Sequence, residues 1–177
     1  MDKRYGMIHG RFQPFHWEHL EYLRHALERC DVLIIGITNP DPSLIVEEVV
    51  SQHRHLEESN PYTFFQRLLM IQNTLLEEDI PPERIIIVPF PIHHPERWHY
   101  YIPREVVHYL RVFSPWEQEK VERLRSRGYQ VEILDPGEEK KLSGVDVRRA
   151  IAQRDDWEDQ VPPAVARIIK NISMGRS

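Results

Sequence analysis

Residues 8–20 read IHGRFQPFHWEHL, and this stretch decides both the fold and the site that we expect. Residues 5–9 form a predicted strand, which runs into a turn at Gly10 and then into a helix that carries His16 and His19. Because these two histidines are three residues apart, their imidazoles project from the same side of the first helical turn. That turn also presents unpaired backbone N–H groups and the positive end of the helix dipole, which attract anions. The stretch therefore predicts a site for phosphoryl chemistry after the first strand.

The chain has 177 residues, of which 41% are hydrophobic and 29% are charged, and we expect one globular domain over residues 1–177. A net charge of -5 provides no global basic field to attract nucleic acid or an anionic membrane. No apolar run approaches the roughly 20 residues that a membrane span needs. A single cysteine, Cys30, permits no internal disulfide and fits a reducing compartment. These properties predict a cytoplasmic protein without nucleic-acid or membrane partners, and they leave a homo-oligomer open.

Strand and helix patterns alternate along the chain, which favours a parallel sheet with helical crossovers. Residues 31–37 and 84–89 are continuous apolar runs, typical of strands that are buried on both faces. Residues 109–113 and 130–134 are weaker strand candidates. We expect an α/β, Rossmann-like open parallel sheet of about five strands, flanked by helices and ending in C-terminal helices. Such sheets bind ligands beyond the carboxyl ends of their strands, where the strand order reverses.

Apolar stripes predict the helices of this sheet. The stripes are formed by Leu20, Leu23, Ala26 and Leu27; by Phe65, Leu68, Leu69, Gln72 and Leu76; by Val121, Leu124 and Arg125; by Val147 and Ile151; and by Val165, Ile168 and Ile169. Pro162 and Pro163 open the last helix, because proline is favoured in the first turn. Residues 38–60 begin with turn signals at 39–42 and continue with mixed polar residues, and a loop of that length is usually a lid, a binding loop or disordered.

The run from Gly10 to His16, followed by His19, resembles the G-R-F-Q-P-F-H-x-G-H signature of the nucleotidylyltransferase superfamily. Within that superfamily it is most similar to the archaeal-type nicotinamide-nucleotide adenylyltransferases. One position departs from the signature, because Glu18 stands where the family has glycine. Its carboxylate lies beside the expected triphosphate, where two like charges 4 Å apart cost about 1 kcal/mol in water. We expect either a Glu18 side chain that points into solvent, or a site altered toward another ligand or toward inactivity.

A second motif lies far downstream, where residues 142–148 read LSGVDVR. It resembles the S-[SG]-T-x-[IV]-R motif of the same family, at the start of a late helix. Ser143 is suited to cap this helix and to offer its hydroxyl or amide to phosphate, and the resemblance implies that Arg148 faces the β- and γ-phosphates. Val145 replaces the family's threonine and removes one hydroxyl. Without the first motif, these residues would indicate an ordinary capped helix with a surface arginine.

The resemblance implies a direct reaction, in which a phosphate oxygen of a mononucleotide attacks the α-phosphorus of a nucleoside triphosphate and pyrophosphate leaves. Catalysis of such a transfer is positioning plus charge stabilisation. The residues implied as catalytic are His16, His19 and Arg148. Those expected to bind the nucleotide are His9, Gly10, Arg11, Phe12, Ser143 and Gly144. No metal-binding side chains are expected, because Mg²⁺ would be carried by the triphosphate.

Two looser matches concern the acceptor. Residues 60–67, NPYTFFQR, resemble the N-P-F-T-x-x-E-R segment of nicotinamide-nucleotide adenylyltransferases, which implies that Arg67 binds the acceptor's phosphate. Residues 89–91, PFP, followed by Trp98, resemble the stretch that supplies a nicotinamide-stacking tryptophan, with a spacing that differs by one residue. The alternative for Trp98 is packing in the core or at its rim.

The resulting prediction is adenylyl transfer from ATP to nicotinamide or nicotinate mononucleotide, a small phosphorylated acceptor. No residue of the sequence can be assigned to recognise the base of the triphosphate. A cytidylyltransferase, or another adenylyltransferase that acts on a phosphorylated metabolite, therefore remains open. A third reading is a nucleotide-binding module whose catalysis is weakened by Glu18 and Val145.

Overall fold

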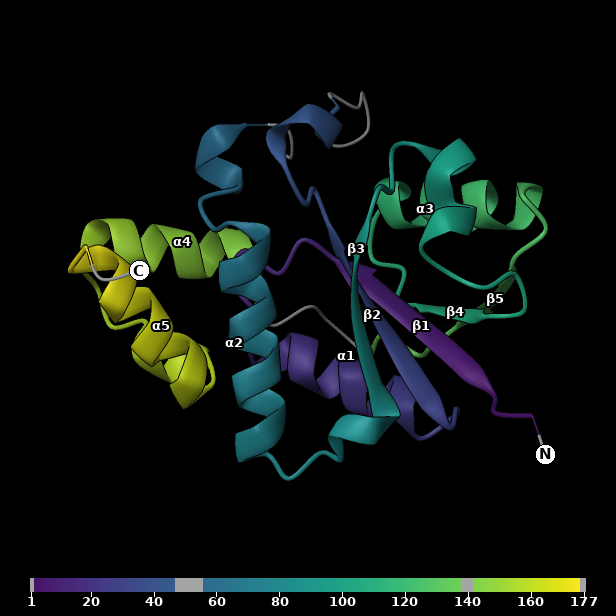
Figure 1. Cartoon of the computed structure of the whole chain (residues 1–177). Coiled ribbons are helices and arrows are strands. Elements are labelled where there is room, and N and C mark those ends of the chain that lie inside the picture. Colours follow the sequence, from purple (N-terminus) through teal and green to yellow (C-terminus); the bar gives the residue numbers. More distant parts are fainter. Residues whose placement is uncertain (1, 47–55, 138–141, 176–177) are drawn as a thin grey trace.

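The computed structural model describes residues 2–46, 56–137 and 142–175, and within these ranges five strands form one sheet (Figure 1). The strands are β1 (Tyr5–Gly10), β2 (Val32–Thr38), β3 (Ile85–Phe90), β4 (Val107–Leu110) and β5 (Gln130–Ile133). Every neighbouring pair is parallel, and the order is β3-β2-β1-β4-β5. The predicted open parallel sheet is confirmed. Its order reverses between β1 and β4, which is where a ligand crevice is expected.

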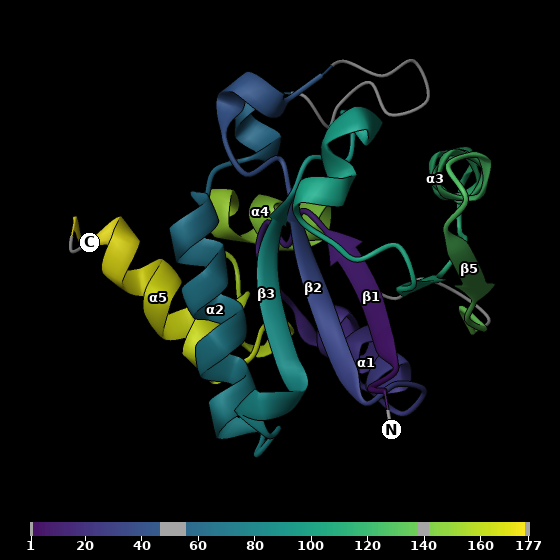
Figure 2. The same cartoon turned by 45° about the vertical axis from the view of Figure 1, so that its right-hand side comes forward.

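The described helices include five α-helices and several short 3-10 helices. The α-helices are α1 (Trp17–Leu27), α2 (Phe64–Glu77), α3 (Pro115–Ser126), α4 (Gly144–Gln153) and α5 (Pro163–Ser173). The 3-10 helices are η1 (Pro42–Leu44), η3 (Glu57–Ser59), η4 (Pro82–Arg84), η5 (Pro95–Tyr100) and η6 (Glu158–Gln160). Figure 2 shows α3 beside β5, well separated from α2 and α5. Among the described residues, no helix is long and apolar enough to cross a membrane.

The sheet carries a hydrophobic core on each face, because successive side chains of a strand point to opposite sides. Ile8 of β1 belongs to the core that α1, α2 and α5 cover, whereas its neighbour Met7 belongs to the core beneath α3 and η5. The predicted α1 stripe is confirmed, since Leu20, Leu23, Ala26 and Leu27 are all buried in the first core. These contacts fix α1 against β1 and place its amino end at the crevice.

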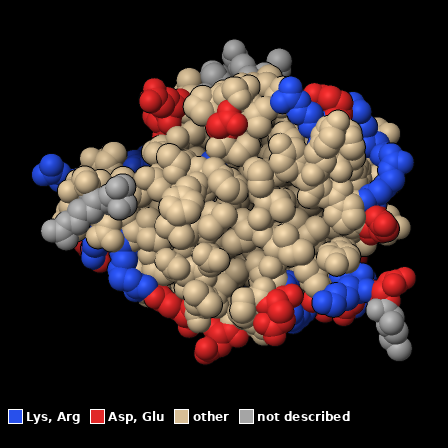
Figure 3. Space-filling view, viewed as in Figure 1, with Lys and Arg blue, Asp and Glu red and all other residues tan. Residues whose placement is uncertain are grey.

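The stripe predicted for α2 is confirmed at Leu68, which packs against the core, but is wrong at Phe65, Gln72 and Leu76. Phe65 and Leu76 are 64% and 58% exposed, and the buried face is formed instead by Arg67, Met70, Ile71, Thr74 and Leu75. The helix is rotated in this way because Arg67, although charged, finds backbone carbonyls to bond beneath α2. The outer face of α2 and β3 lies within the largely uncharged middle of the surface in Figure 3, whose charged side chains gather at the rim.

The remaining differences are small. The fourth strand begins at Val107, two residues before the predicted start, and Arg125 lies on the exposed side of α3 whereas Val121 and Leu124 are buried. Both predicted C-terminal helices are confirmed, with Pro163 as the first residue of α5. Residues 47–55 of the 38–60 loop lie outside the described residues, so the predicted role of that loop stays a prediction.

Candidate active site

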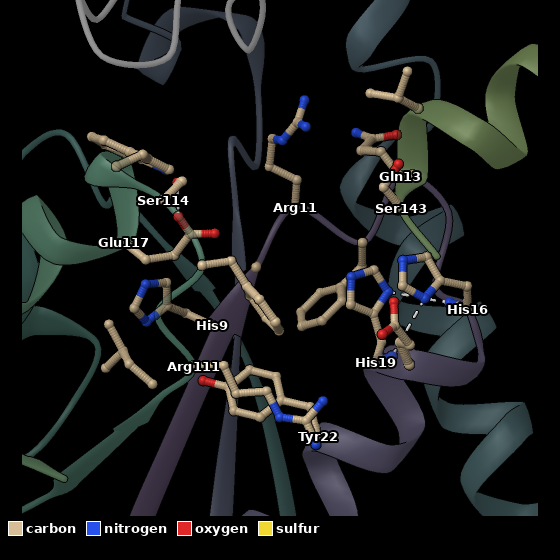
Figure 4. A pocket seen from close by; sticks show the side chains of 18 of the residues that line it. His9, Arg11, Gln13, His16, His19, Tyr22, Arg111, Ser114, Glu117 and Ser143 are labelled. Carbon is tan, nitrogen blue, oxygen red and sulfur yellow. Dashed lines mark hydrogen bonds between the residues drawn. The ribbon is translucent and has the colours of Figure 1, made fainter. Parts of the chain in front are cut away.

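A pocket of about 450 Å³ lies at the point where the sheet order reverses (Figure 4). Its walls come from four segments that follow or face the carboxyl ends of β1 and β4. They are the turn after β1, the first turns of α1, the β4–α3 connection with the start of α3, and the amino end of α4. All the residues predicted as catalytic or nucleotide-binding line it: His9, Gly10, Arg11, Phe12, His16, His19, Ser143, Gly144 and Arg148. The fold thus brings together two motifs that are more than a hundred residues apart.

His16 and His19 cap the amino end of α1 reciprocally. The His16 Nδ1 accepts a hydrogen bond from the His19 backbone N–H at 3.4 Å, and the His19 Nδ1 accepts one from the His16 backbone N–H at 3.2 Å. The two rings are stacked with centroids 3.6 Å apart, and Figure 4 shows them side by side on one wall of the pocket. An accepting Nδ1 carries no proton, so each neutral ring holds its proton on Nε2. The cap thereby makes Nε2 the hydrogen-bond donor of both imidazoles.

The turn between β1 and α1 is held in place by contacts of Phe12, Gly10 and Arg11. Phe12 has a positive φ of 52° and is almost fully buried, and its ring lies edge-on to those of Phe15 and His19. A Cβ on Gly10 would lie 3.2 Å from the Phe12 ring, so glycine suits this close approach. Arg11 donates to the Ser59 carbonyl at 3.0 Å. These contacts hold the turn in the shape that lines the pocket.

The amino end of α4 forms the facing wall. Ser143 caps it in a box with Asp146, because the Asp146 N–H bonds the Ser143 Oγ and the Asp146 carboxylate accepts from the Ser143 N–H at 3.1 Å. Arg148 donates from Nη1 to the Gln13 carbonyl at 2.7 Å, which ties the second motif to the first. A Cβ on Gly144 would lie 2.7 Å from the same Arg148 nitrogen and 3.3 Å from the Gln13 oxygen. Glycine at position 144 therefore leaves the space through which Arg148 reaches the first motif.

The structure contradicts the first of the two expectations for Glu18, and the second, an altered or inactive site, stays a prediction. The side chain does not point into solvent: it is half-buried, and its Oε2 accepts a hydrogen bond from the Leu142 N–H at 2.7 Å. Leu142 directly precedes the cap of α4. The carboxylate therefore joins α1 to the amino end of α4, and part of its charge is compensated by a backbone donor.

A third wall, from β4 and α3, was not predicted from the sequence. Arg111 and Lys120 are each 9% exposed, Ser114 donates to the Glu117 carboxylate, and Lys120 lies 5.3 Å from the Trp116 ring centroid. All of them line the pocket. The sequence carries one pattern that could have indicated this wall. Shortly after a strand, Ser114 and Pro115 begin a helix, and Glu117 follows three residues after the serine.

His9 lies against this wall, at the end of β1. The residue is 6% exposed, and its Nδ1 has no hydrogen-bond partner among the described residues. Burial lowers the pKa of His9 well below its ordinary value, and the nearby Lys120 and His108 lower it further. His108, which is fully buried behind it, has its pKa lowered to about 3 by burial. Both imidazoles are therefore neutral at neutral pH.

The structure does not bring Arg67 or Trp98 into the pocket. Arg67 is 1% exposed, and its guanidinium donates to the carbonyls of Arg11, Thr38, Asn39 and Thr63 at 2.7–3.1 Å. Burial lowers its pKa to about 10, which leaves it charged at neutral pH. Trp98 is fully buried, and its indole N–H bonds the Pro91 carbonyl at 2.9 Å. Their expected role at the acceptor stays a prediction, and the polar atoms named here bond the protein's own backbone.

A family model described as cytidylyltransferase-like matches residues 7–150, which include the whole pocket. The chain belongs to the cytidylyltransferase-like family. This confirms the resemblance to nucleotidyltransferases, and nucleotidyl transfer is the activity that the family supports.

Two relatives in this family differ in their named substrates. The phosphonoformate cytidylyltransferase of Streptomyces viridochromogenes is 46% identical over 169 residues, which cover 96% of this chain and 92% of that protein. The nicotinamide-nucleotide adenylyltransferase of Saccharolobus solfataricus is 33% identical, over 94% of this chain and 90% of that protein. The more specific adenylyltransferase prediction is therefore not confirmed.

Solved structures share the fold at low identity. A bifunctional NMN adenylyltransferase/ADP ribose pyrophosphatase of Francisella tularensis has a TM-score of 0.72 at 15% identity, covering 97% of this chain and 50% of that one. The same protein complexed with AMP and a manganese ion has a TM-score of 0.69. At this identity, the likeness is evidence for the fold alone.

Proposed function

We propose that the protein transfers the cytidylyl group of CTP to a small acid that bears a phosphonate or phosphate, and that pyrophosphate is released. The observation that carries the proposal is the meeting of two helix amino ends, with His16, His19 and Arg148, at one pocket. Helix amino ends bind phosphates through their N–H groups and dipoles, and a pocket with two of them suits a triphosphate. The 46% identity to a cytidylyltransferase supports CTP as its source.

In the proposed reaction, an oxygen of the acceptor's phosphonate attacks the α-phosphorus of CTP in line with the leaving group. A phosphorus–oxygen bond forms to the acceptor, and the bond from the α-phosphorus to the bridging oxygen breaks. Pyrophosphate leaves with that electron pair. The protein then forms no covalent intermediate with the substrates. It aligns the reacting groups and stabilises the charge that develops on the phosphates.

Named residues supply these functions. His16 and His19 donate from Nε2 to oxygens around the bond that breaks, because their cap fixes the proton on that atom. Arg148 binds the β- and γ-phosphates from the opposite wall. The described residues contain no cluster of three or more His, Cys, Asp or Glu that could hold a metal, and the pocket carboxylates of Glu18 and Glu117 already accept hydrogen bonds. Mg²⁺ fits this pocket as an ion carried by the triphosphate, where it neutralises phosphate charge.

A nicotinamide-nucleotide adenylyltransferase is the second candidate, and the NPYTFFQR segment and the 33% identical relative favour it. The positions of Arg67 and Trp98 count against it. A phosphate-binding arginine and a stacking tryptophan must reach the substrate, whereas these two side chains are buried and bonded to the backbone.

The test is pyrophosphate release measured for CTP and ATP, each paired with phosphonoformate and with nicotinamide mononucleotide. We expect the highest kcat/KM for CTP with phosphonoformate, and no release from a variant that carries both His16→Ala and His19→Ala. Preference for ATP with the mononucleotide would establish the second candidate. No release from any of the four pairs, in a preparation that binds CTP, would contradict both.

A further inference from the structure

We propose that Glu18 is a positioning residue, whose carboxylate holds the amino end of α4 in register with His16 and His19 for nucleotidyl transfer. Glutamate at this position departs from the glycine of the superfamily signature, and its contact crosses 124 positions of the chain. Glycine has no side chain that could make this contact. The substitution therefore adds a link between the two motifs.

The link connects the two walls at the point where their alignment matters. On one side, Glu18 lies between His16 and His19 in the first turns of α1. On the other side, the Leu142 N–H lies one residue before the Ser143 cap and six residues before Arg148. A shift of α4 along or away from α1 would move Arg148 relative to the two imidazoles. In a transfer that depends on positioning, a misplacement of about 1 Å costs about a hundredfold in rate.

The second link between the motifs does not replace the first. Arg148 donates to the Gln13 carbonyl at 2.7 Å, and the Gln13 side chain bonds both backbone groups of Tyr62 at 2.9 and 3.0 Å. That contact ends at the guanidinium, which is the group that must bind phosphate. The Glu18 contact ends instead at the backbone N–H of Leu142, so it fixes the backbone at the helix end. The two links are therefore different in kind.

The charge of Glu18 is also placed favourably for α4. A carboxylate near the amino end of a helix is stabilised by the helix dipole, and a hydrogen bond from a backbone N–H to a charged acceptor is stronger than one to a neutral acceptor. The same contact draws negative charge toward the Leu142 N–H and away from the triphosphate. This explains how the pocket can carry glutamate where glycine is usual.

The test compares Glu18→Gly, Glu18→Ala and Glu18→Gln with wild type, and uses Glu28→Gln at the exposed end of α1 as the control. Steady-state kinetics are measured with the best triphosphate and acceptor pair, and hydrogen exchange of the Leu142 amide is measured on the protein alone. For Glu18→Gly and Glu18→Ala we expect kcat to fall about tenfold to a hundredfold, with a smaller change in KM. We expect exchange of the Leu142 amide to accelerate about tenfold.

Glu18→Gln keeps an oxygen that can accept from Leu142, so it should retain most of the turnover and the slow exchange, and Glu28→Gln should match wild type. Turnover of Glu18→Gly at or above the wild-type rate would overturn the proposal. So would faster exchange without a loss of kcat, a loss of kcat without faster exchange, or a Glu18→Gln variant as impaired as Glu18→Ala. If no pair turns over, the affinity for inorganic pyrophosphate replaces kcat as the readout, and a fall in Glu18→Gly and Glu18→Ala alone is expected. Affinity that is unchanged in both would overturn the proposal.

Discussion

Two arginines that the sequence assigned to phosphates occupy opposite kinds of environment. Arg148 lies on the wall of the pocket, across from the capped histidines of α1, and its Nη1 donates to the Gln13 carbonyl. Arg67 lies on the buried face of α2, and its guanidinium donates to four backbone carbonyls. The difference shows that, of two arginines at matching motif positions, only Arg148 lines this pocket. We therefore expect Arg67, whose donors bond the backbone, to stabilise the fold, and Arg148 to bind phosphate.

The largest effect that we expect on turnover is at the α1 end of the pocket. His19→Ala removes a donor aimed at charge that develops in the transition state, so kcat should fall by roughly 10²–10³ with a much smaller change in CTP affinity. Single-turnover kinetics and calorimetric titration of CTP would separate the two quantities. Trp17→Phe, at an exposed position in the same helical turn, serves as the matched control and should keep its rate. A loss below about fivefold in His19→Ala would remove this residue from the mechanism.

The next largest fall in kcat is expected for Arg148→Ala. Because the guanidinium is proposed to bind the β- and γ-phosphates, we expect kcat to fall by about a hundredfold, and the affinity for pyrophosphate to fall as well. Arg148→Lys keeps the charge but loses the bidentate geometry, so it should recover only part of the activity. Arg149→Ala, one residue along α4, is the control. Equal kcat and KM values for Arg148→Ala and Arg149→Ala would contradict a phosphate-binding role for Arg148, and with it the proposed difference from Arg67.

Arg67→Met tests the other side of the comparison. It leaves the carbonyls of Arg11, Thr38, Asn39 and Thr63 without this donor, so the free energy of unfolding should fall by about 3 kcal/mol. The protein that remains folded should keep kcat and KM within about fivefold of wild type. Urea unfolding and initial rates at low temperature measure the two effects. Arg67→Lys should lie between wild type and Arg67→Met in stability.

A large rise in the acceptor's KM for Arg67→Lys, without a loss of stability, would restore the role in acceptor binding that the sequence suggested. That outcome would also favour the nicotinamide-nucleotide candidate.

The smallest expected effect concerns the wall that contains His9 and His108. The folded-state pKa of His108, about 3, lies below the ordinary value of 6.5, so the unfolded chain binds the proton more readily. This imidazole therefore causes no loss of stability above pH 6.5, and stability falls as the pH drops from 6.5 toward 3. His108→Leu should make unfolding less sensitive to pH between 7 and 5, as measured by urea titration at both values. An unchanged pH dependence would contradict the neutral, buried state of His108.

Much of the fold could be predicted because its signals are local. The buried strands are continuous apolar runs, the α1 stripe follows helical spacing, and the two helix starts carry capping residues within three positions of one another. The buried face of α2 could not be predicted in this way. Arg67 becomes an interior residue only because carbonyls from the ends of β1 and β2 meet beneath it, and those groups come from distant parts of the chain.

The site could likewise be predicted where its signals are local, and not where it depends on contacts between distant parts of the chain. Motif residues near Gly10 and Ser143 were placed at the pocket, since the carboxyl ends of parallel strands share one edge of the sheet. The wall with Arg111 and Lys120 was missed, although Ser114, Pro115 and Glu117 mark the start of a helix there, because that pattern does not show which side chains after β4 turn inward. The Glu18 contact was missed for a related reason. A hydrogen bond across 124 positions has no local pattern.

In the proposed reaction, the triphosphate lies between the amino ends of α1 and α4. The most direct measurement is a crystal structure with Mg²⁺ and a CTP analogue whose α–β bridge resists cleavage. We expect phosphate oxygens within hydrogen-bond distance of Nε2 of His16 and His19 on one side and of the Arg148 guanidinium on the other, with Glu18 still bonded to Leu142. Phosphates bound above β2 and β3 beside Arg67, with Arg148 out of contact, would contradict the account.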